Sequence, residues 1–120
     1  RRWCGFLPFL YRLGAPDGHE MVVVPWGFVT DFASIPRSLW AVMPPTGQYG
    51  KAAVIHDWLY QMRLILPRPR TCTRWEADAI FKEAMQVLGV GAWTCRLLYL
   101  GVRLAGWRTW KTYRQRERQR

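Results

Sequence analysis

The chain has 120 residues, which is enough for one domain with a hydrophobic core and too few for two domains. Half of the residues are hydrophobic and 15% are aromatic, and this composition excludes a largely disordered chain. Eighteen Lys and Arg residues against eight Asp and Glu residues give a net charge of +10, so we expect an anionic partner: nucleic acid, a phospholipid surface or an acidic protein.

Two features limit the class of protein further. The cysteines are odd in number and lack paired spacing, so we expect neither a disulfide framework nor a zinc site, and a reducing compartment or a particle assembled in the cytoplasm is the default. No membrane-spanning segment is expected, because Arg103 interrupts the longest apolar stretch, residues 97–107. We therefore expect one domain over residues 1–120, with residues 108–120 as a basic C-terminal extension.

The N-terminal residues favour β-structure. Residues 3–13 are aromatic and extended in character, and residues 14–18 read as a turn because they combine Pro with Gly. Residues 21–24 are β-branched and apolar, so we predict a hairpin across residues 9–24. Residues 28–30 predict a further short strand.

A short helix is expected next. Ser34 can cap its free amides, Pro36 suits its first turn, and it ends before Pro44. Asp31 lies just before this start, where it either caps and braces the turn or acts as a binding residue.

Two longer helices follow. After a loop at residues 46–50, apolar residues at three- and four-residue steps predict the first, with the buried stripe Ala52, Ile55, Leu59, Met62 and Leu66. Residues 67–70 stop it, since they contain two prolines. The residues Thr73 to Glu76 have the spacing of a capping box and open the second helix, whose stripe is Ala77, Phe81, Ala84, Met85 and Leu88.

A last helix is expected from about Ala92 through Trp107 or further. Its apolar face consists of Leu97, Leu100, Leu104 and Trp107. Its basic residues are candidates for binding an anionic partner: Arg103, Arg108, Lys111 and Arg114. A basic amphipathic helix with tryptophans suits an anionic membrane, and the same charges suit phosphates of nucleic acid. The alternative is a core helix followed by a solvated tail. The predicted fold is α+β, mainly α, with an N-terminal β-hairpin packed on an antiparallel helix pair plus a C-terminal basic helix.

The candidate site lies on the first long helix. His56, Asp57 and Tyr60 are spaced so that they share neighbouring parts of one helix face. Asp78 on the next helix would orient the imidazole, which would activate a water, while Tyr60 would hold a carboxylate. Asp57 would bind a hard cation such as calcium through oxygen.

Helix geometry sets a condition on this site. At about 1.5 Å per residue, His56 lies about 15 Å before a helix end at Leu66, whereas Asp78 lies only about 7 Å into the next helix. The two meet only if the first helix ends nearer Met62 or if the helices cross at an angle. The alternative is that His56 and Asp57 are structural and bond to neighbouring loops.

Residues 24–37, 49–60 and 76–85 closely resemble a small family of bacteriophage and prophage proteins classed as a domain of unknown function. The resemblance covers roughly residues 20–110. It implies a phage origin and supplies no activity.

The pattern His-Asp-x-x-Tyr at residues 56–60, followed by Asp-x-x-Phe at residues 78–81, looks like the calcium-dependent secretory phospholipases. This resemblance implies that His56 activates water, Asp57 binds calcium, and Asp78 with Tyr60 orients the histidine. Val54 and Ile55 stand near where that family carries cysteines.

Two functions are consistent with these patterns. One is a phage-encoded lipid ester hydrolase that acts at the bacterial envelope. The other is a non-catalytic virion or assembly protein, in the phage particle or the host cytoplasm, whose basic tail binds nucleic acid or neighbouring virion subunits. The distance between His56 and Asp78, and the exposure of His56, discriminate between them.

Overall fold

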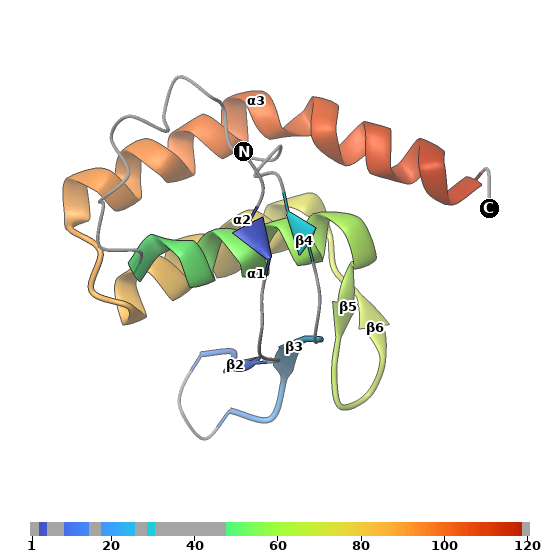
Figure 1. Cartoon of the computed structure of the whole chain (residues 1–120), viewed down its shortest axis with the longest axis horizontal. Helices are drawn as coiled ribbons and strands as arrows, with labels where there is room; N and C mark the ends of the chain where they lie inside the picture. The colour runs from blue at the N-terminus through green and yellow to red at the C-terminus, as the bar shows by residue number, and fades with distance from the viewer. Residues whose placement is uncertain (1–2, 5–8, 15–17, 26–28, 31–47, 119–120) are drawn as a thin grey trace.

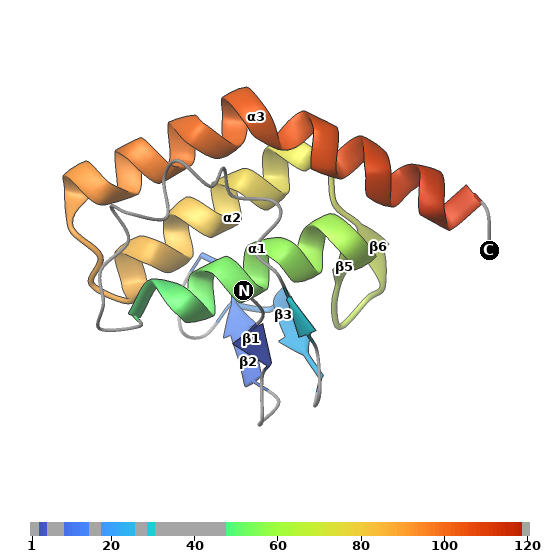
Figure 2. The same cartoon turned by 45° about the horizontal axis from the view of Figure 1, so that its top comes forward.

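The computed structural model describes residues 3–4, 9–14, 18–25, 29–30 and 48–118. Within these residues it has the predicted α+β, mainly α architecture, with helices α1 (Gln48–Met62), α2 (Arg74–Val87) and α3 (Ala92–Arg118). Figures 1 and 2 show α1 and α2 running antiparallel with α3 lying along them, and the N-terminal hairpin on the opposite side of α1 from α3. The predicted short helix after residue 34 lies outside the described residues, as does Asp31.

The predicted N-terminal hairpin is confirmed. Strands β2 (Phe9–Arg12) and β3 (Met21–Val24) are antiparallel partners, with Leu10 opposite Val23. Val22 and Val24 point into the core because side chains alternate along a strand. The hydroxyl of Tyr11 donates to Glu83 of α2 at 2.7 Å, so the hairpin is fastened to the helices by a polar contact as well.

Two further strand pairs occur in the described part of the chain. Strand β1 (Trp3–Cys4) pairs with β4 (Val29–Thr30), which agrees with the predicted strand there. Strands β5 (Leu64–Ile65) and β6 (Arg70–Thr71) form a second hairpin where the sequence predicted only a helix stop. Backbone bonds between Met21 and Leu66, at 2.8 and 2.9 Å, join this hairpin to β3.

Helix α1 differs from its prediction at both ends. It begins at Gln48, inside the predicted loop, and ends at Met62, so the prediction that its stripe continues to Leu66 was wrong. Arg63 takes a φ of 53°, and its backbone turns the chain from α1 into β5. Met62 is consequently 43% exposed instead of buried.

The second long helix follows its prediction. The side chain of Thr73 accepts a hydrogen bond from the backbone N–H of Glu76 at 3.1 Å, as a capping residue does. The predicted stripe is buried, with Leu88 only partly so. Gly89 follows at a φ of 83°, where a residue without Cβ is favoured.

Helix α3 buries a different face from the predicted apolar one. Its buried residues are Cys95, Leu98, Val102 and Gly106. The predicted apolar face remains in solvent: Leu97, Leu100, Leu104 and Trp107 are all among the exposed hydrophobic residues. Helix α3 also continues through the predicted basic extension as far as Arg118.

Candidate functional site

His56, Tyr60 and Asp78 meet in the core between α1 and α2. Nε2 of His56 lies 2.6 Å from Oδ1 of Asp78, and the hydroxyl of Tyr60 donates to the same oxygen at 2.6 Å. All three side chains have no exposed surface. The contact between His56 and Asp78 that the sequence suggested is therefore present. It is buried away from solvent.

The early end of α1 makes this contact geometrically feasible. Because α1 stops at Met62, the β5–β6 hairpin returns the chain alongside it, and α2 starts only after Thr73. Asp78 then lies just over one turn into α2, level with His56. One of the two conditions set by helix geometry, an end near Met62, is met.

Asp78 also binds cations from two other turns. Nη1 of Arg103 on α3 donates to Oδ2 of Asp78 at 2.7 Å, and Nε of Arg74 lies 3.9 Å from the same oxygen. Burial by itself raises the pKa of Asp78, but the hydrogen bonds from His56, Tyr60 and Arg103 outweigh it and hold that pKa below its usual value. Asp78 is therefore an ionised carboxylate shared by all three helices.

Tyr60 is enclosed by aromatic and backbone surfaces. The His56 ring lies 4.3 Å from it, and Trp110 meets it edge-on at 5.2 Å. A Cβ at Gly106 would come within 2.5 Å of the Tyr60 hydroxyl oxygen, so α3 approaches this closely only because residue 106 is glycine. Burial, followed by the charge of Asp78, raises the pKa of Tyr60, which stays protonated.

Asp57 lies beside the network with partners of its own. Oδ2 accepts from Nε2 of Gln61 at 3.1 Å, and Oδ1 accepts from the hydroxyl of Tyr113 at 3.3 Å. Asp57 is fully buried. Across the ranges that the structure describes, no three His, Cys, Asp or Glu side chains gather as a metal site would require. The predicted calcium ligation by Asp57 stays a prediction.

The predicted basic binding residues separate into two groups. Arg108 and Lys111 are exposed on α3. Arg103 is engaged with Asp78, and Arg114 donates to the backbone carbonyls of Tyr60 and Gln61 at the end of α1, the latter at 2.8 Å. Arg103 was expected on the surface, but in the structure it closes the buried network.

Sequence reasoning missed the contribution of α3 to the site. Arg103, Gly106, Trp110 and Tyr113 lie at three- and four-residue steps, so they form one face that turns toward α1 and α2. A glycine inside an otherwise regular helix, flanked at this spacing by an arginine and aromatic residues, was the available signal.

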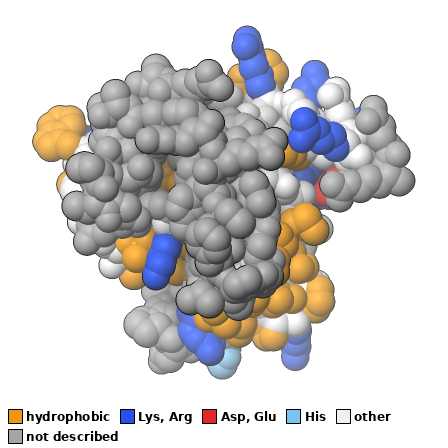
Figure 3. Space-filling model, in the orientation of Figure 1, with side chains coloured by type: hydrophobic (Ala, Val, Ile, Leu, Met, Phe, Trp, Pro, Cys, Tyr) orange, Lys and Arg blue, Asp and Glu red, His pale blue; other side chains and the backbone are white. Residues whose placement is uncertain are grey.

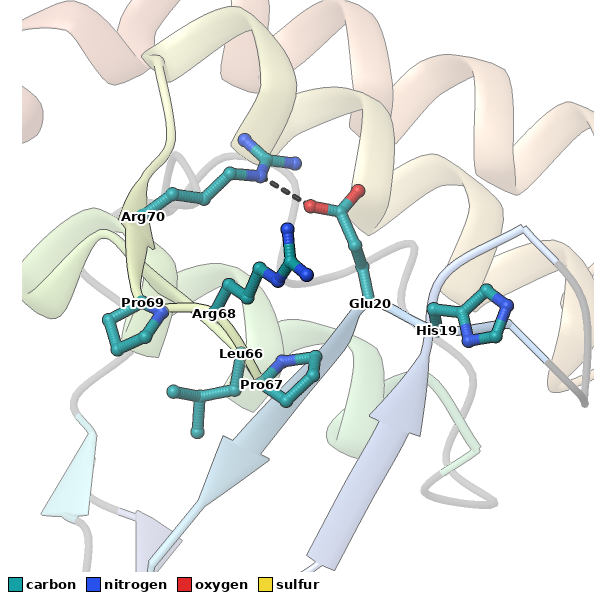
Figure 4. Close-up of a pocket in the computed structure, with 7 residues that line it drawn as sticks. All are labelled: His19, Glu20, Leu66, Pro67, Arg68, Pro69 and Arg70. Carbon is teal, nitrogen blue, oxygen red and sulfur yellow. Dashed lines mark hydrogen bonds and ion pairs between the residues drawn. The ribbon is translucent and has the colours of Figure 1, made fainter.

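A separate pocket lies between the start of β3 and the β5–β6 hairpin (Figure 4). Its volume is about 480 Å³, and His19, Glu20 and residues 66–70 line it. Arg70 contacts Glu20 at 2.5 Å and Glu76 at 2.6 and 3.1 Å, so it bridges a strand end and α2. The pocket lies apart from the His56 network.

With this geometry in place, the chain can be assigned to a family. Residues 8–102 match the family described as "Protein of unknown function (DUF1353)", and the chain belongs to it. This confirms the expectation of a domain of unknown function.

The chain is also similar to an uncharacterized bacterial protein. Uncharacterized protein y4jT of Sinorhizobium fredii (strain NBRC 101917 / NGR234) is 32% identical to this chain over 85 residues, or 69% of the chain. The match spans 23% of that relative's length. No solved structure matches the chain.

Proposed function

We propose that the chain is a non-catalytic component of a bacteriophage particle or of its assembly, in which the Asp78 network holds the three helices together. The observation that carries this proposal is the complete burial of His56, Asp57 and Asp78. A buried ion cluster without access to solvent fixes the arrangement of helices, since each helix loses a partner if it moves.

The bonding pattern supports the same role. The three hydrogen-bonding partners of Asp78 come from the two neighbouring helices: His56 and Tyr60 from α1, and Arg103 from α3. Asp57 in turn links α1 to Tyr113 on α3. These contacts form a buried polar network between the three helices. Such a network specifies how the helices pack, because each polar group is satisfied in only one arrangement.

The phage context and the partner rest on other observations. The motifs in residues 24–37, 49–60 and 76–85 resemble phage and prophage proteins. The C-terminal part of α3 exposes Arg108, Lys111, Arg116 and Arg118. Its acidic residue, Glu117, is paired with Arg63 at 2.9 Å, so the exposed surface there is basic and suits an anionic neighbour.

A phospholipase-like hydrolase is the second candidate, favoured by one observation. Nε2 of His56 and the hydroxyl of Tyr60 meet on a single oxygen of Asp78, as the resemblance to secretory phospholipases implies for an oriented imidazole. Catalysis would require the site to open to water, because His56 has no exposed surface.

One experiment separates the two candidates. His56→Ala removes a buried side chain that contacts the ionised carboxylate of Asp78 at 2.6 Å, so we expect it to lower the free energy of unfolding by about 3 kcal/mol and the melting temperature by on the order of 10 °C. His19→Ala is the matched control, because His19 is exposed. Both variants and the parent chain are also assayed for fatty acid release from anionic phospholipid vesicles, with calcium and with a chelator.

The outcomes point in opposite directions. A destabilised His56→Ala with no ester release by any variant supports the structural proposal. Ester release by the parent chain that is lost in a folded His56→Ala variant would replace it with the hydrolase. A His56→Ala variant as stable as His19→Ala would contradict the structural proposal outright.

A further inference from the structure

Helix α3 carries two apolar faces on opposite sides. One, with Leu98 and Val102 at its centre, packs against the other helices. The second consists of Trp93, Leu97, Leu100, Leu104 and Trp107, which we call the outer stripe. At 3.6 residues per turn these five positions lie in one line, roughly opposite the buried face.

The outer stripe is exposed to an unusual degree. Trp93 is 82% exposed and Leu104 is 78% exposed, and the other three residues are between 43% and 49% exposed. Single exposed leucines are common on protein surfaces, but a continuous line of five large apolar side chains marks an interaction surface. No helix in the described part of the chain is long and apolar enough to cross a membrane.

Charge decides which kind of partner fits. Helix α3 carries seven Lys and Arg residues and one acidic residue, Glu117. Arg96 lies over the Trp93 ring at 6.0 Å and Arg108 over the Trp107 ring at 5.2 Å, so cations flank both ends of the stripe. In Figure 3, Lys and Arg side chains gather over the C-terminal half of α3, while hydrophobic side chains protrude near its beginning.

We infer that the outer stripe docks on an anionic lipid surface, with α3 lying in the plane of the interface. Leucines in the middle of the stripe would enter the acyl region, and Trp93 and Trp107 would sit at the headgroup level, as tryptophans prefer. Arg108, Lys111 and Arg118, which are exposed and lie near the line of the stripe, would contact lipid phosphates. The inference uses no residue of the Asp78 network; it shares with the proposed function the exposed basic residues of the C-terminal part of α3, and it names the anionic partner for them.

Other occupants fit less well. A second copy of the chain would bring two strongly basic helices together, and like charges oppose that contact. Nucleic acid would satisfy the arginines but would leave three leucines of the stripe without an apolar partner.

Vesicle flotation tests the inference with the full chain. The probes are vesicles of phosphatidylglycerol with phosphatidylcholine and vesicles of phosphatidylcholine alone. We expect binding to the anionic vesicles, weakened by salt. We expect at least ~10-fold weaker binding for the double variant Leu100→Gln/Leu104→Gln, because each leucine contributes substantially to apolar burial.

A matched control uses exposed apolar residues elsewhere. Trp75 and Val87 on α2 are 63% and 68% exposed, so Trp75→Gln/Val87→Gln removes comparable apolar surface away from the stripe. It should bind within about 2-fold of the parent chain. Arg108→Gln/Lys111→Gln should weaken binding and reduce its salt dependence. Thermal unfolding of each variant shows whether the fold is retained.

Three results would overturn the inference. The first is no binding to anionic vesicles at low salt. The second is equal loss of binding in the stripe variant and the α2 variant. The third is a different occupant of the stripe. In that case the parent chain would dimerise in solution or be retained on duplex DNA without binding vesicles, and the stripe variant would lose that dimerisation or retention.

Discussion

Asp78 is the residue on which the site depends. Its two oxygens receive His56, Tyr60 and Arg103, at 2.6 to 2.7 Å, from the two helices that flank α2. The acid group remains ionised in the core because these donors stabilise its charge more than burial opposes it. The stability that this charge contributes is complete above the ordinary carboxyl pKa. It is lost as the pH falls toward the lowered pKa of the folded state.

Gly106 permits the close approach of α3 to Tyr60, so we expect Gly106→Ala to destabilise the protein by about 2 kcal/mol. Alanine would add about 1 kcal/mol of helix preference, but its Cβ would meet the Tyr60 hydroxyl oxygen at 2.5 Å and the ring at 3.3 and 3.4 Å. The ring is fully buried and cannot move aside without losing its bond to Asp78.

Urea unfolding measures this effect. Gly91→Ala is the control, since a Cβ there meets nothing within 4 Å, and it should lower the free energy of unfolding by no more than about 1 kcal/mol, the cost of alanine at the position that precedes a helix. A Gly106→Ala variant more stable than the parent chain would mean that Tyr60 is not held as tightly as its contacts indicate.

The buried hydroxyl of Tyr60 makes the free energy of unfolding depend on pH in the alkaline range. Burial first, and then Asp78, raises its folded pKa, while burial and Glu83 raise that of Tyr11. The stability contributed by each phenol is therefore complete below its unfolded pKa, about 10, and is lost as the pH rises above that value. We expect the free energy of unfolding to decline above about pH 10.

Replacing the phenols should flatten that decline. Tyr60→Phe removes one hydrogen bond and costs about 1 kcal/mol at pH 7, but its alkaline slope is smaller by up to about 1.4 kcal/mol per pH unit. Tyr11→Phe/Tyr60→Phe should be flatter still. Urea unfolding between pH 7 and pH 11 measures both, and an unchanged slope would show that neither phenol is retained in its protonated form.

At the scale of elements, the end of α3 acts as a cap for α1. Arg114 donates to the carbonyls of Tyr60 and Gln61, which lie in the last turn of α1 and lack partners within the helix. Its guanidinium also lies over Trp110 at 4.5 Å. The basic sequence that suggested a solvated tail therefore contains at least one arginine with an internal role.

Arg114→Ala should consequently destabilise the chain by about 2 kcal/mol, because two charge-assisted hydrogen bonds and a stacking contact are lost. Arg114→Lys should recover only part of this, since lysine lacks the planar fork. Arg118→Ala is the control, because Arg118 is exposed one turn further on, and it should leave the melting temperature within about 2 °C of the parent value. Equal effects at residues 114 and 118 would argue against the cap.

The elements that the sequence predicted well are those whose signals are local. The Thr73 cap and the apolar stripe of α2 depend on neighbouring residues of one helix, and both are confirmed. The hairpin of β2 and β3 follows from alternation and a turn. The end of α1 was misplaced because the apolar residues beyond Met62 fit a helix as well as a strand, and only pairing of β5 with β6 and contact with β3 decides between them.

At the scale of the molecule, the hairpins and helices are fastened by contacts distant in sequence. Arg70 bridges Glu20 and Glu76, and Tyr11 reaches Glu83. The exposed ion pairs add little stability individually, but they fix where the hairpins lie against α2. Helix α3 runs along the upper edge of the molecule in Figure 1, on the side of α1 away from strands β2 and β3.

The sequence by itself determined the second long helix and the first hairpin, since periodicity and capping are properties of nearby residues. It offered the contact of His56 with Asp78 only on the condition that the first long helix ended early or that the two helices crossed at an angle. It could not determine which of the two apolar faces of α3 is buried, because both have helical spacing. Tertiary packing decided this: Gly106 lets one face approach Tyr60, while Arg103 and Arg114 take partners on that side. The same choice sealed His56 in the core and left Trp93 to Trp107 exposed.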